Sequence, residues 1–158
     1  MPHAVIGLGA NLGDPAAQLR AAIAAIGTLP GTRVLAVSSF YRTAPVGVAA
    51  QPDFVNAAVA IDTALAPRAL LAALAGLERA AGRERTRAGA PRPLDLDILL
   101  YGERVVDEPD LRIPHPRLHE RAFALAPLIE VAPGAVVPGR GPAADLLARC
   151  AGQRIERV

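Results

Sequence analysis

The sequence contains no lysine and no tryptophan, and all 17 of its basic residues are arginines. Its 15 acidic residues nearly balance them, so the net charge of the 158-residue chain is +2. A chain this close to neutral has no overall electrostatic attraction to nucleic acid or to a membrane surface, and we expect neither as a partner. Any site for a polyanion must therefore be local. The absence of lysine also excludes the GxxxxGK[ST] phosphate-binding loop.

The chain has a single cysteine, Cys150, so it can form neither an internal disulfide nor a CxxC metal or redox motif. This cysteine usage is typical of a reducing compartment. The first residues lack a basic leader, and no stretch approaches the roughly 18 uncharged apolar residues that a membrane span needs. We therefore expect a cytoplasmic protein that is neither secreted nor inserted in a membrane.

Apolar residues, by contrast, are plentiful. The chain is 52% hydrophobic, which is enough for the core of one compact domain, and we expect that domain to span residues 1–158. Alternating and branched apolar residues between turn signals predict strands, and clustered proline and glycine predict a loop. The predicted strands are at 3–10, 32–43 and 54–61, and the predicted loop is at 44–52.

Two helices are predicted from their start and stop signals. The first begins at Pro15 with Asp14 as its N-cap, and the second begins at Pro67 and stops at Gly82. A further strand holds two aspartates, described below. The order strand, helix, strand, strand, helix, strand is the split βαβ pattern of the ferredoxin-like α+β folds, in which two helices cover one face of an antiparallel sheet.

Additional elements follow this core. We expect two short extended pieces near Val105 and Ile113, the apolar segment 121–134, and a short helix that begins near Pro142. The ferredoxin-like arrangement occurs in RNA-binding modules, metal carriers and enzymes, so the fold alone indicates no function. The function must be inferred from particular side chains.

Two aspartates, Asp95 and Asp97, interrupt the apolar stretch RPLDLDILL. Strand geometry places both carboxylates on one face, about 7 Å apart, with Leu99 and Tyr101, and places the alternate leucines and Ile98 on the other face. Burying two ionised carboxylates this close together is costly unless cations lie between them. Arginine partners are the structural explanation, and hard divalent cations such as Mg²⁺ are the functional one.

The stretch before the aspartates, GRERTRAGAPR, carries more positive charge than structural salt bridges to two aspartates would need, since only Glu84 opposes it. The planar guanidinium suits phosphate oxygens, and an arginine loop can close over a polyphosphate while Mg²⁺ bridges that polyphosphate to the aspartates. This context favours a nucleotide phosphate site. The arginines of the stretch are Arg83, Arg85, Arg87 and Arg92.

The glycines of GLGANLGD, which are Gly7, Gly9 and Gly13, have the spacing GxGxxxG. The dinucleotide-binding turn requires GxGxxG, and the next strand ends without the acidic residue that a ribose would need. We therefore expect these glycines to serve a tight turn from strand to helix. Asn11, which lies between them, is available to a ligand.

Phe54 and Asn56 are expected on the strand face opposite to the apolar residues of the strand at 54–61. An aromatic ring beside an amide can stack on a flat heterocycle and match its donor and acceptor edge. Core packing is the alternative for the phenylalanine, whereas a buried amide in a strand needs polar partners. The pair indicates a site for a second substrate.

His115 and His119, in RIPHPRLHER, have the i, i+4 spacing of a helical metal pair. Pro116 and the lack of a third ligand nearby argue against zinc. A phosphate contact, or hydrogen bonding within the loop, is the better interpretation for His115. Arg121 and Phe123 follow closely in the sequence.

Taken in order, the segments GLGANLGD, SSFYRTAPVG, QPDFVNAAV, GRER, PRPLDLDILLYG and IPHPRLHERAFALAPLIEVAP resemble the 6-hydroxymethyl-7,8-dihydropterin pyrophosphokinase family of folate biosynthesis. The resemblance runs from the first strand to about Pro133. It implies transfer of pyrophosphate from ATP to the hydroxymethyl oxygen of a reduced pterin, with release of AMP and with two Mg²⁺ ions as cofactors. The implied partners are ATP and the reduced pterin, without nucleic acid, membrane or a second subunit.

The resemblance also implies roles for residues at matching positions. Asp95 and Asp97 match the family's Mg²⁺ ligands, and Arg83 and Arg92 match its catalytic arginines on the transferring phosphates. The implied ATP contacts are Glu78, Arg83, Arg85, Arg92, Ile98, Arg112, His115 and Arg121. The implied pterin contacts are the stacking residues Phe54 and Phe123, together with Asn11, Thr43, Ala44, Val46 and Asn56.

Two departures from the family pattern leave alternatives open. The loop RERTRAGAPR has glycine and alanine where some relatives carry an aromatic lid residue, so either Arg85 or Arg87 closes on ATP. Asp110 stands where some relatives have arginine, and Arg112, on the same face of an extended segment, is the candidate to substitute for it.

A ferredoxin-like RNA-binding module is the alternative from another class, with Phe54 as a stacking platform and the arginine loop as a phosphate grip. The chain lacks the aromatic-rich pattern that such modules carry on adjacent strands, and two strand aspartates would repel a nucleic-acid backbone in the absence of metal. A metal- or nucleotide-binding domain without turnover is a third interpretation. The combined motifs favour the enzyme.

Overall fold

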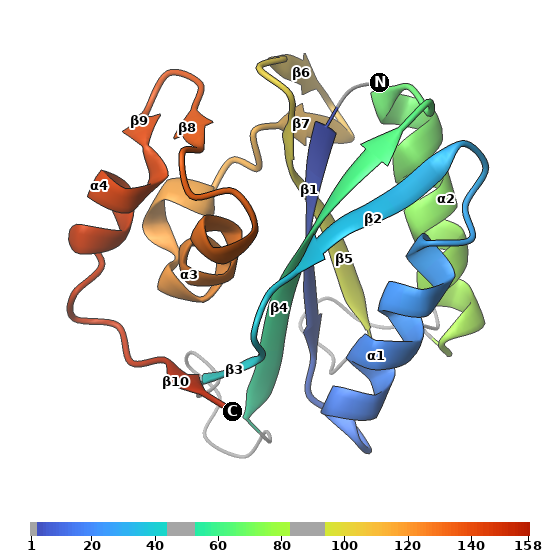
Figure 1. Cartoon of the computed structure of the whole chain (residues 1–158), viewed down its shortest axis with the longest axis horizontal. Coiled ribbons are helices and arrows are strands. Elements are labelled where there is room, and N and C mark those ends of the chain that lie inside the picture. The colour runs from blue at the N-terminus through green and yellow to red at the C-terminus, as the bar shows by residue number, and fades with distance from the viewer. Residues whose placement is uncertain (1–2, 44–52, 83–93) are drawn as a thin grey trace.

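A computed structural model describes residues 3–43, 53–82 and 94–158 of the chain (Figure 1). The strands are β1 (His3–Ala10), β2 (Thr32–Val37), β3 (Tyr41–Thr43), β4 (Phe54–Thr63), β5 (Asp95–Tyr101), β6 (Val106–Glu108), β7 (Leu111–Ile113), β8 (Val136–Val137), β9 (Gly141–Pro142) and β10 (Glu156–Arg157). The helices are α1 (Pro15–Ile26), α2 (Pro67–Ala80), α3 (Ala122–Val131) and α4 (Ala143–Ala148), with a 3₁₀ turn, η1 (Leu118–Glu120).

Within the described residues, six strands form an antiparallel sheet in the order β10-β3-β4-β1-β5, and β2 pairs with β4 beside β3. Helices α1 and α2 cover one face of this sheet, and α3 and α4 lie on the other (Figure 1). The hairpin of β6 and β7 and the small pair of β8 and β9 lie outside the sheet. The predicted α+β arrangement is confirmed, with the elements after the core covering its second face.

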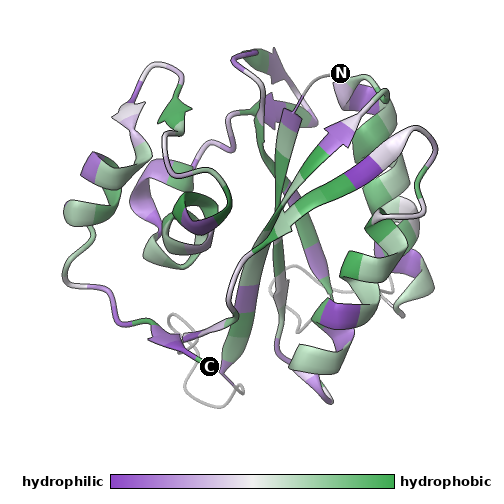
Figure 2. Ribbon diagram, viewed as in Figure 1, coloured by the Kyte–Doolittle hydropathy of each residue, from purple (hydrophilic) through white to green (hydrophobic). Residues whose placement is uncertain are grey.

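The sheet is buried on both faces, which explains why its strands are so apolar. One core cluster joins the sheet to α1 and α2, with Leu19 and Leu70 among its fully buried side chains. The other joins the sheet to α3 and α4 around Leu125 and Leu128. Figure 2 shows hydrophobic colour along the strands between the two helical layers. No helix in the described part of the chain is long and apolar enough to cross a membrane.

The predicted helix boundaries are confirmed by their caps. The carboxylate of Asp14 accepts a hydrogen bond of 3.1 Å from the backbone N–H of Ala17, and Pro15 is the first residue of α1. Helix α2 begins at Pro67 and ends just before Gly82, whose φ of 96° is the left-handed conformation that glycine adopts without a Cβ clash.

The predicted single strand at 32–43 is wrong, because the chain forms β2 and β3 with a break between them. Ser38 interrupts the ladder, and its hydroxyl oxygen accepts a 2.9 Å hydrogen bond from the backbone N–H of Ala58. The register shifts across the break, from Val37 opposite Val59 to Tyr41 opposite Asn56. A side chain that takes the place of a backbone partner ends regular pairing, and propensity does not predict this.

The predicted facing of the last residues of β5 is also wrong. Ile98 pairs with Ile6 and Leu100 with Val5, so Leu99 is an extra residue that forms a β-bulge. After the bulge the alternation reverses, and Tyr101 packs in the core under α1 and α2 instead of sharing the face of the aspartates. The carbonyl of Leu99 accepts a 3.2 Å hydrogen bond from the backbone N–H of His115, and this bond links the segment after β7 to β5.

A carboxylate of α3 joins three segments on the second face of the sheet. Glu130 accepts hydrogen bonds from the Ser39 N–H at 2.5 Å, the Tyr41 hydroxyl at 2.5 Å and the Arg157 guanidinium at 2.8 Å. Burial raises the pKa of Glu130, but the hydrogen bonds from Tyr41 and Ser39 outweigh it and hold the pKa below its usual value. The carboxylate thereby fixes β3 and β10 against α3.

We expect Glu130→Gln to lower the free energy of unfolding by about 1 kcal/mol at about pH 7, because the bonds from Tyr41 and Arg157 lose their charge assistance and the exposed arginine is screened by water. The pKa of Glu130 is lower in the folded than in the unfolded chain, so its contribution is present above the unfolded pKa and is lost as the pH falls through the folded pKa. The difference between the urea unfolding curves of variant and wild type should shrink as the pH falls below about 4.3, the usual pKa of a glutamate, and should vanish below the folded pKa. A constant difference at every pH would contradict this, and Glu103→Gln, at an exposed position, is the control.

Candidate active site

One row of residues crosses the sheet at the end of β1. Gly9 lies opposite Asn56 of β4 on one side and opposite Asp95 of β5 on the other. Directly opposed residues of antiparallel strands point to the same face, and neighbouring strands are about 4.8 Å apart, so the Cα atoms of Asn56 and Asp95 stand about 10 Å apart. No β1 side chain lies between them in this row, because the intervening residue is glycine.

The role of Gly9 differs from the prediction for the glycine-rich segment. A Cβ atom at position 9 would come 3.0 Å from the side-chain oxygen of Asn56, which is tighter than nine in ten real Cβ contacts, so the amide would have to shift. Gly7 and Gly9 therefore lie inside β1, where no side chain projects from the strand at their positions, and they do not form a turn. Of the three glycines only Gly13, with φ of 60°, serves the turn into α1.

Asp95 and Asp97 share one face of β5, as predicted. Both are half-buried, and they alternate with the buried Leu96 and Ile98 of the opposite face. Asp97 lies opposite Gly7, so both carboxylates stand next to strand positions without a side chain. This arrangement leaves the carboxylates accessible at a sheet that is otherwise buried on both faces.

Glu78 of α2 fixes the backbone between the two aspartates. Strand β5 is at the edge of the sheet, so one side of its backbone lacks a strand partner. The carboxylate of Glu78 accepts a 2.8 Å hydrogen bond from the Leu96 N–H, and Glu78 is only 7% exposed. The sequence predicted Glu78 as an ATP contact, which stays a prediction, and the structure adds this positioning role.

A histidine and an arginine lie near the aspartates. Burial lowers the pKa of the His115 imidazole, Arg121 lowers it further, and Asp95 partly opposes them. Burial also lowers the pKa of the Arg121 guanidinium, and Asp97 and Asp95 act against that shift. The structure therefore brings together four residues that the sequence assigned to phosphate and metal binding, from β5, the segment after β7 and the start of α3.

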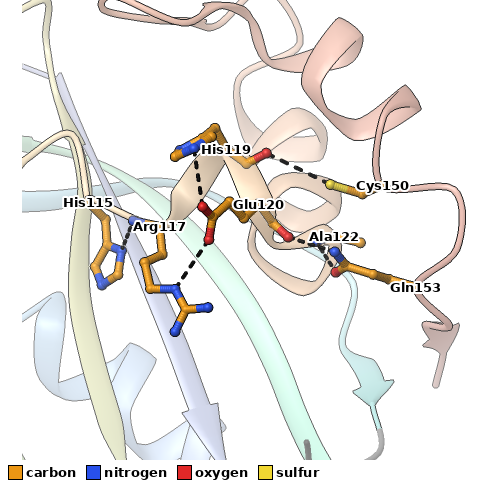
Figure 3. A network of polar contacts seen from close by, with 7 residues as sticks. All are labelled: His115, Arg117, His119, Glu120, Ala122, Cys150 and Gln153. Atoms are coloured by element: carbon orange, nitrogen blue, oxygen red, sulfur yellow. Dashed lines mark hydrogen bonds and ion pairs between the residues drawn. The ribbon is translucent and has the colours of Figure 1, made fainter.

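The segment from His115 to α3 is held by its own polar contacts, shown in Figure 3. The ring nitrogen Nδ1 of His115 accepts a 3.2 Å hydrogen bond from the Arg117 N–H. The Arg117 guanidinium lies 3.3 Å from a carboxylate oxygen of Glu120, and the imidazole of His119 lies 3.5 Å from the other. The loop hydrogen bonding predicted as one interpretation for His115 is thus present.

The β6-β7 hairpin carries Asp110, the predicted departure from the family pattern, and Arg112, a predicted ATP contact. Asp110 pairs with Arg68 of α2 through two hydrogen bonds of 3.0 Å, and this contact lowers the pKa of Asp110. Arg112 is exposed and lies 3.4 Å from Asp107 within the hairpin, so it does not join the aspartates of β5.

Ile98, another predicted ATP contact, lies on β5. It is 5% exposed and packs in the core on the face opposite to the aspartates.

Within the described residues, a cavity of about 240 Å³ borders the β6-β7 hairpin. It has apolar walls and several basic side chains, and it includes the predicted ATP contacts Arg112 and His115. Its other polar lining residues are Asp107, His119 and Arg140.

Three of the residues predicted to bind a flat heterocycle, Thr43, Phe54 and Asn56, lie at the paired ends of β3 and β4. The Asn56 amide donates a 3.0 Å hydrogen bond to the Thr43 hydroxyl, and both side chains are buried. Phe54 is half-buried opposite Thr43, and Asn11 is buried just after β1. The Arg121 guanidinium lies 5.4 Å from the centre of the Phe123 ring on α3. Stacking between the two phenylalanines stays a prediction.

Several predicted site residues lie outside the described part of the chain. They belong to the loop at 44–52 and to the arginine-rich stretch before β5. They are Ala44, Val46, Arg83, Arg85, Arg87 and Arg92.

The donor set fits a divalent cation that arrives with a polyphosphate. In the described ranges no group of three or more His, Cys, Asp or Glu side chains gathers that could hold a metal by itself. Asp95 and Asp97 offer hard oxygen ligands on one face, and Mg²⁺ typically binds one or two carboxylates and completes its shell with phosphates and water. The residues present therefore fit Mg²⁺.

The sequence matches a family model described as 7,8-dihydro-6-hydroxymethylpterin-pyrophosphokinase (HPPK) over residues 5–133. Similar curated proteins carry the name 2-amino-4-hydroxy-6-hydroxymethyldihydropteridine pyrophosphokinase. The protein from Pseudomonas aeruginosa is 46% identical over 97% of this chain and 94% of its own length. Those from Methylorubrum extorquens and Haemophilus influenzae are 45% and 42% identical over 100% of this chain and 99% of their own.

Solved structures of HPPK-DHPS from Plasmodium falciparum have the same fold. The wild type with pteroate aligns with a TM-score of 0.74 at 13% identity and covers 94% of this chain. A complex of a triple mutant aligns with a TM-score of 0.74 at 15% identity. The present chain spans 42% and 44% of the lengths of those chains, so this similarity concerns one part of them.

We expect Glu78→Ala to lower the free energy of unfolding by about 2 kcal/mol, because the Leu96 N–H loses its buried acceptor. The exposed Glu103→Ala serves as the matched control, with an expected change within about 0.5 kcal/mol. Urea unfolding of the three proteins measures the difference. Equal losses in both variants would show that the contact with Leu96 contributes nothing.

Proposed function

The chain belongs to the 7,8-dihydro-6-hydroxymethylpterin-pyrophosphokinase family, and from this premise we propose how its residues transfer pyrophosphate from ATP to the hydroxymethyl group of 6-hydroxymethyl-7,8-dihydropterin. This transfer is a step of folate biosynthesis. The observation that carries the proposal is the row Asn56, Gly9 and Asp95, which places a residue with an amide for the heterocycle two strands, about 10 Å of backbone, from a residue with a carboxylate for the phosphates. The RNA-binding alternative is not favoured.

At one end of this row, the pterin is held by Phe54, Asn56 and Thr43. The bond from the Asn56 amide to Thr43 turns the amide oxygen toward the space over Gly9. That oxygen can accept from a ring N–H of the pterin, and the rings of Phe54 and Phe123 can cover its faces. A buried amide with a fixed orientation discriminates strongly, since a ligand without the matching donor leaves it unpaired.

At the other end, Asp95 and Asp97 hold Mg²⁺ together with the triphosphate, and we propose two ions. When bound, Mg²⁺ neutralises phosphate charge and lowers the pKa of the attacking hydroxyl. Arg121 interacts with both aspartates and His115 with Asp95, and both side chains are proposed to contact phosphate oxygens. Burial of the Arg121 guanidinium strengthens its interaction with a charged ligand.

The reaction joins the two ends of the row. The hydroxymethyl oxygen of the pterin attacks the β-phosphorus in line and loses its proton to solvent, the bond between the β-phosphorus and the α,β-bridging oxygen breaks, and AMP leaves with that oxygen. The chain contributes by positioning both substrates and stabilising charge, as is general for phosphoryl transfer, and no covalent intermediate is needed.

Other parts of the proposal rest on the sequence alone. Arg83 and Arg92 are proposed to contact the transferring phosphates, and either Arg85 or Arg87 to close on ATP, all outside the described residues. A monomer, a single domain over residues 1–158 and a cytoplasmic location are proposed in the same way.

The function is tested by incubating the protein with ATP, Mg²⁺ and 6-hydroxymethyl-7,8-dihydropterin and measuring AMP. We expect AMP only when all three are present. Binding of ATP without pterin-dependent AMP would refute the proposed function and leave a nucleotide-binding module.

We expect the double variant Asp95→Asn, Asp97→Asn to lose turnover by about a thousandfold or more, because it removes the charges that hold Mg²⁺ on the phosphates. Both side chains are half-exposed and amides have the same shape, so the fold should persist. Asp145→Asn on the exposed side of α4 is the matched control and should keep full activity. Mg²⁺-dependent AMP formation by a folded double variant would contradict the role of the aspartates.

We expect Gly9→Ala to raise KM for the pterin by about tenfold, because the new Cβ displaces the Asn56 oxygen that reads the pterin edge. KM for ATP should change less. Gly134→Ala is the matched control, since a Cβ there meets no atom within 4 Å. Steady-state kinetics with each substrate varied in turn measures the split, and equal changes in both constants would argue against a specific role of Gly9.

A further inference from the structure

A glutamine near the C-terminus clasps the backbone on both sides of Arg121. The side-chain oxygen of Gln153 accepts a 2.9 Å hydrogen bond from the Ala122 N–H, and its side-chain nitrogen donates a 2.6 Å hydrogen bond to the Glu120 carbonyl. Figure 3 shows both contacts, which reach from the turn after α4 to the junction of η1 and α3. Gln153 lies beyond residues 5–133, which the family model matches.

This junction needs an external partner. Arg121 has extended backbone angles, φ −120° and ψ 105°, and its side chain does not cap α3. The first N–H groups of a helix lack intrahelical acceptors, and Ala122 is the first residue of α3. The Gln153 amide satisfies this donor and also a carbonyl at the end of η1, so one planar group fixes the two peptide units that flank Arg121.

The turn that carries Gln153 is itself anchored. The Gln153 N–H donates a 3.0 Å hydrogen bond to the Cys150 carbonyl, and the Cys150 thiol lies 3.9 Å from the His119 carbonyl. Cys150 is 7% exposed in the core shared by α3 and α4. The exposed glutamine therefore follows a turn that the buried Cys150 anchors in the core.

The direction of Arg121 matters because of what surrounds it. Its guanidinium is partly buried, interacts with Asp95 and Asp97, and lies over the Phe123 ring. A planar guanidinium recognises phosphate oxygens through directed hydrogen bonds, so a small rotation of the backbone at this residue misplaces it.

We propose that Gln153 is a positioning residue that holds Arg121 in the direction needed to bind the polyphosphate of ATP. This inference rests on the proposed function, because it assumes that Arg121 contacts the phosphates. Gln153 itself does not touch the substrate.

The test compares Gln153→Ala with Gln18→Ala on α1, the matched control, by calorimetric binding of MgATP and by steady-state kinetics. We expect Gln153→Ala to weaken MgATP binding and raise KM for ATP by about tenfold, with a smaller change in KM for the pterin. Gln18→Ala should leave MgATP binding and the KM values for ATP and the pterin unchanged. Unchanged MgATP binding by folded Gln153→Ala would overturn the proposal.

A double-mutant cycle separates positioning from a merely structural role. If Gln153 acts through Arg121, Gln153→Ala should have little further effect on MgATP affinity in an Arg121→Ala background, whereas a purely structural role predicts additive losses that overturn the proposal. Should Gln153→Ala not fold, Gln153→Glu keeps the acceptor for the Ala122 N–H, loses the donor to Glu120, and is expected to show the same pattern.

The binding measurement distinguishes the two proposals. Wild type that binds MgATP but forms no AMP would refute the proposed function, while the effect of Gln153→Ala on binding would still decide the role of Gln153. Wild type that does not bind MgATP would overturn both.

Discussion

The site depends on the pairing of β1 between β4 and β5. This register places Gly9 between Asn56 and Asp95, so the residue proposed to read the heterocycle and the residue proposed to bind metal share one face of one sheet. Because strands keep a fixed spacing, the distance between the two ends of the site is set by backbone hydrogen bonds and not by flexible side chains. Pre-organisation of this kind suits a reaction whose rate comes mainly from positioning.

The strand that carries both carboxylates is an edge strand, and its outer side is held by contacts from other elements. Glu78 accepts from the Leu96 N–H, and the Leu99 carbonyl accepts from the His115 N–H. The second contact is possible because the β-bulge at Leu99 releases that residue from regular pairing with β1. The same irregularity that made the predicted facing of Tyr101 wrong therefore brings His115 beside Asp95.

Predictions from local pattern held where the physical cause is local. The start of α1 follows from Asp14 and Pro15, and the alternation of β4 residues between the two core clusters follows from the two-residue period of a strand. The break at Ser38 was not predictable in this way, because it depends on the Ala58 N–H of another strand. The placement of Gly9 between β4 and β5 was missed for the same reason, although the pattern of Gly9, Asn11 and Gly13 had indicated a ligand contact in this segment.

The sequence by itself determined which functional groups are available. They are two carboxylates on one face of a strand, an aromatic ring and an amide on one face of a different strand, and cationic side chains suited to phosphates. Only the tertiary structure decided that Gly9 separates Asn56 from Asp95 and that Gln153 clasps the backbone around Arg121. The reason is physical. Composition and periodicity report how each segment meets water and core, whereas register and packing between distant segments depend on how those segments fit one another.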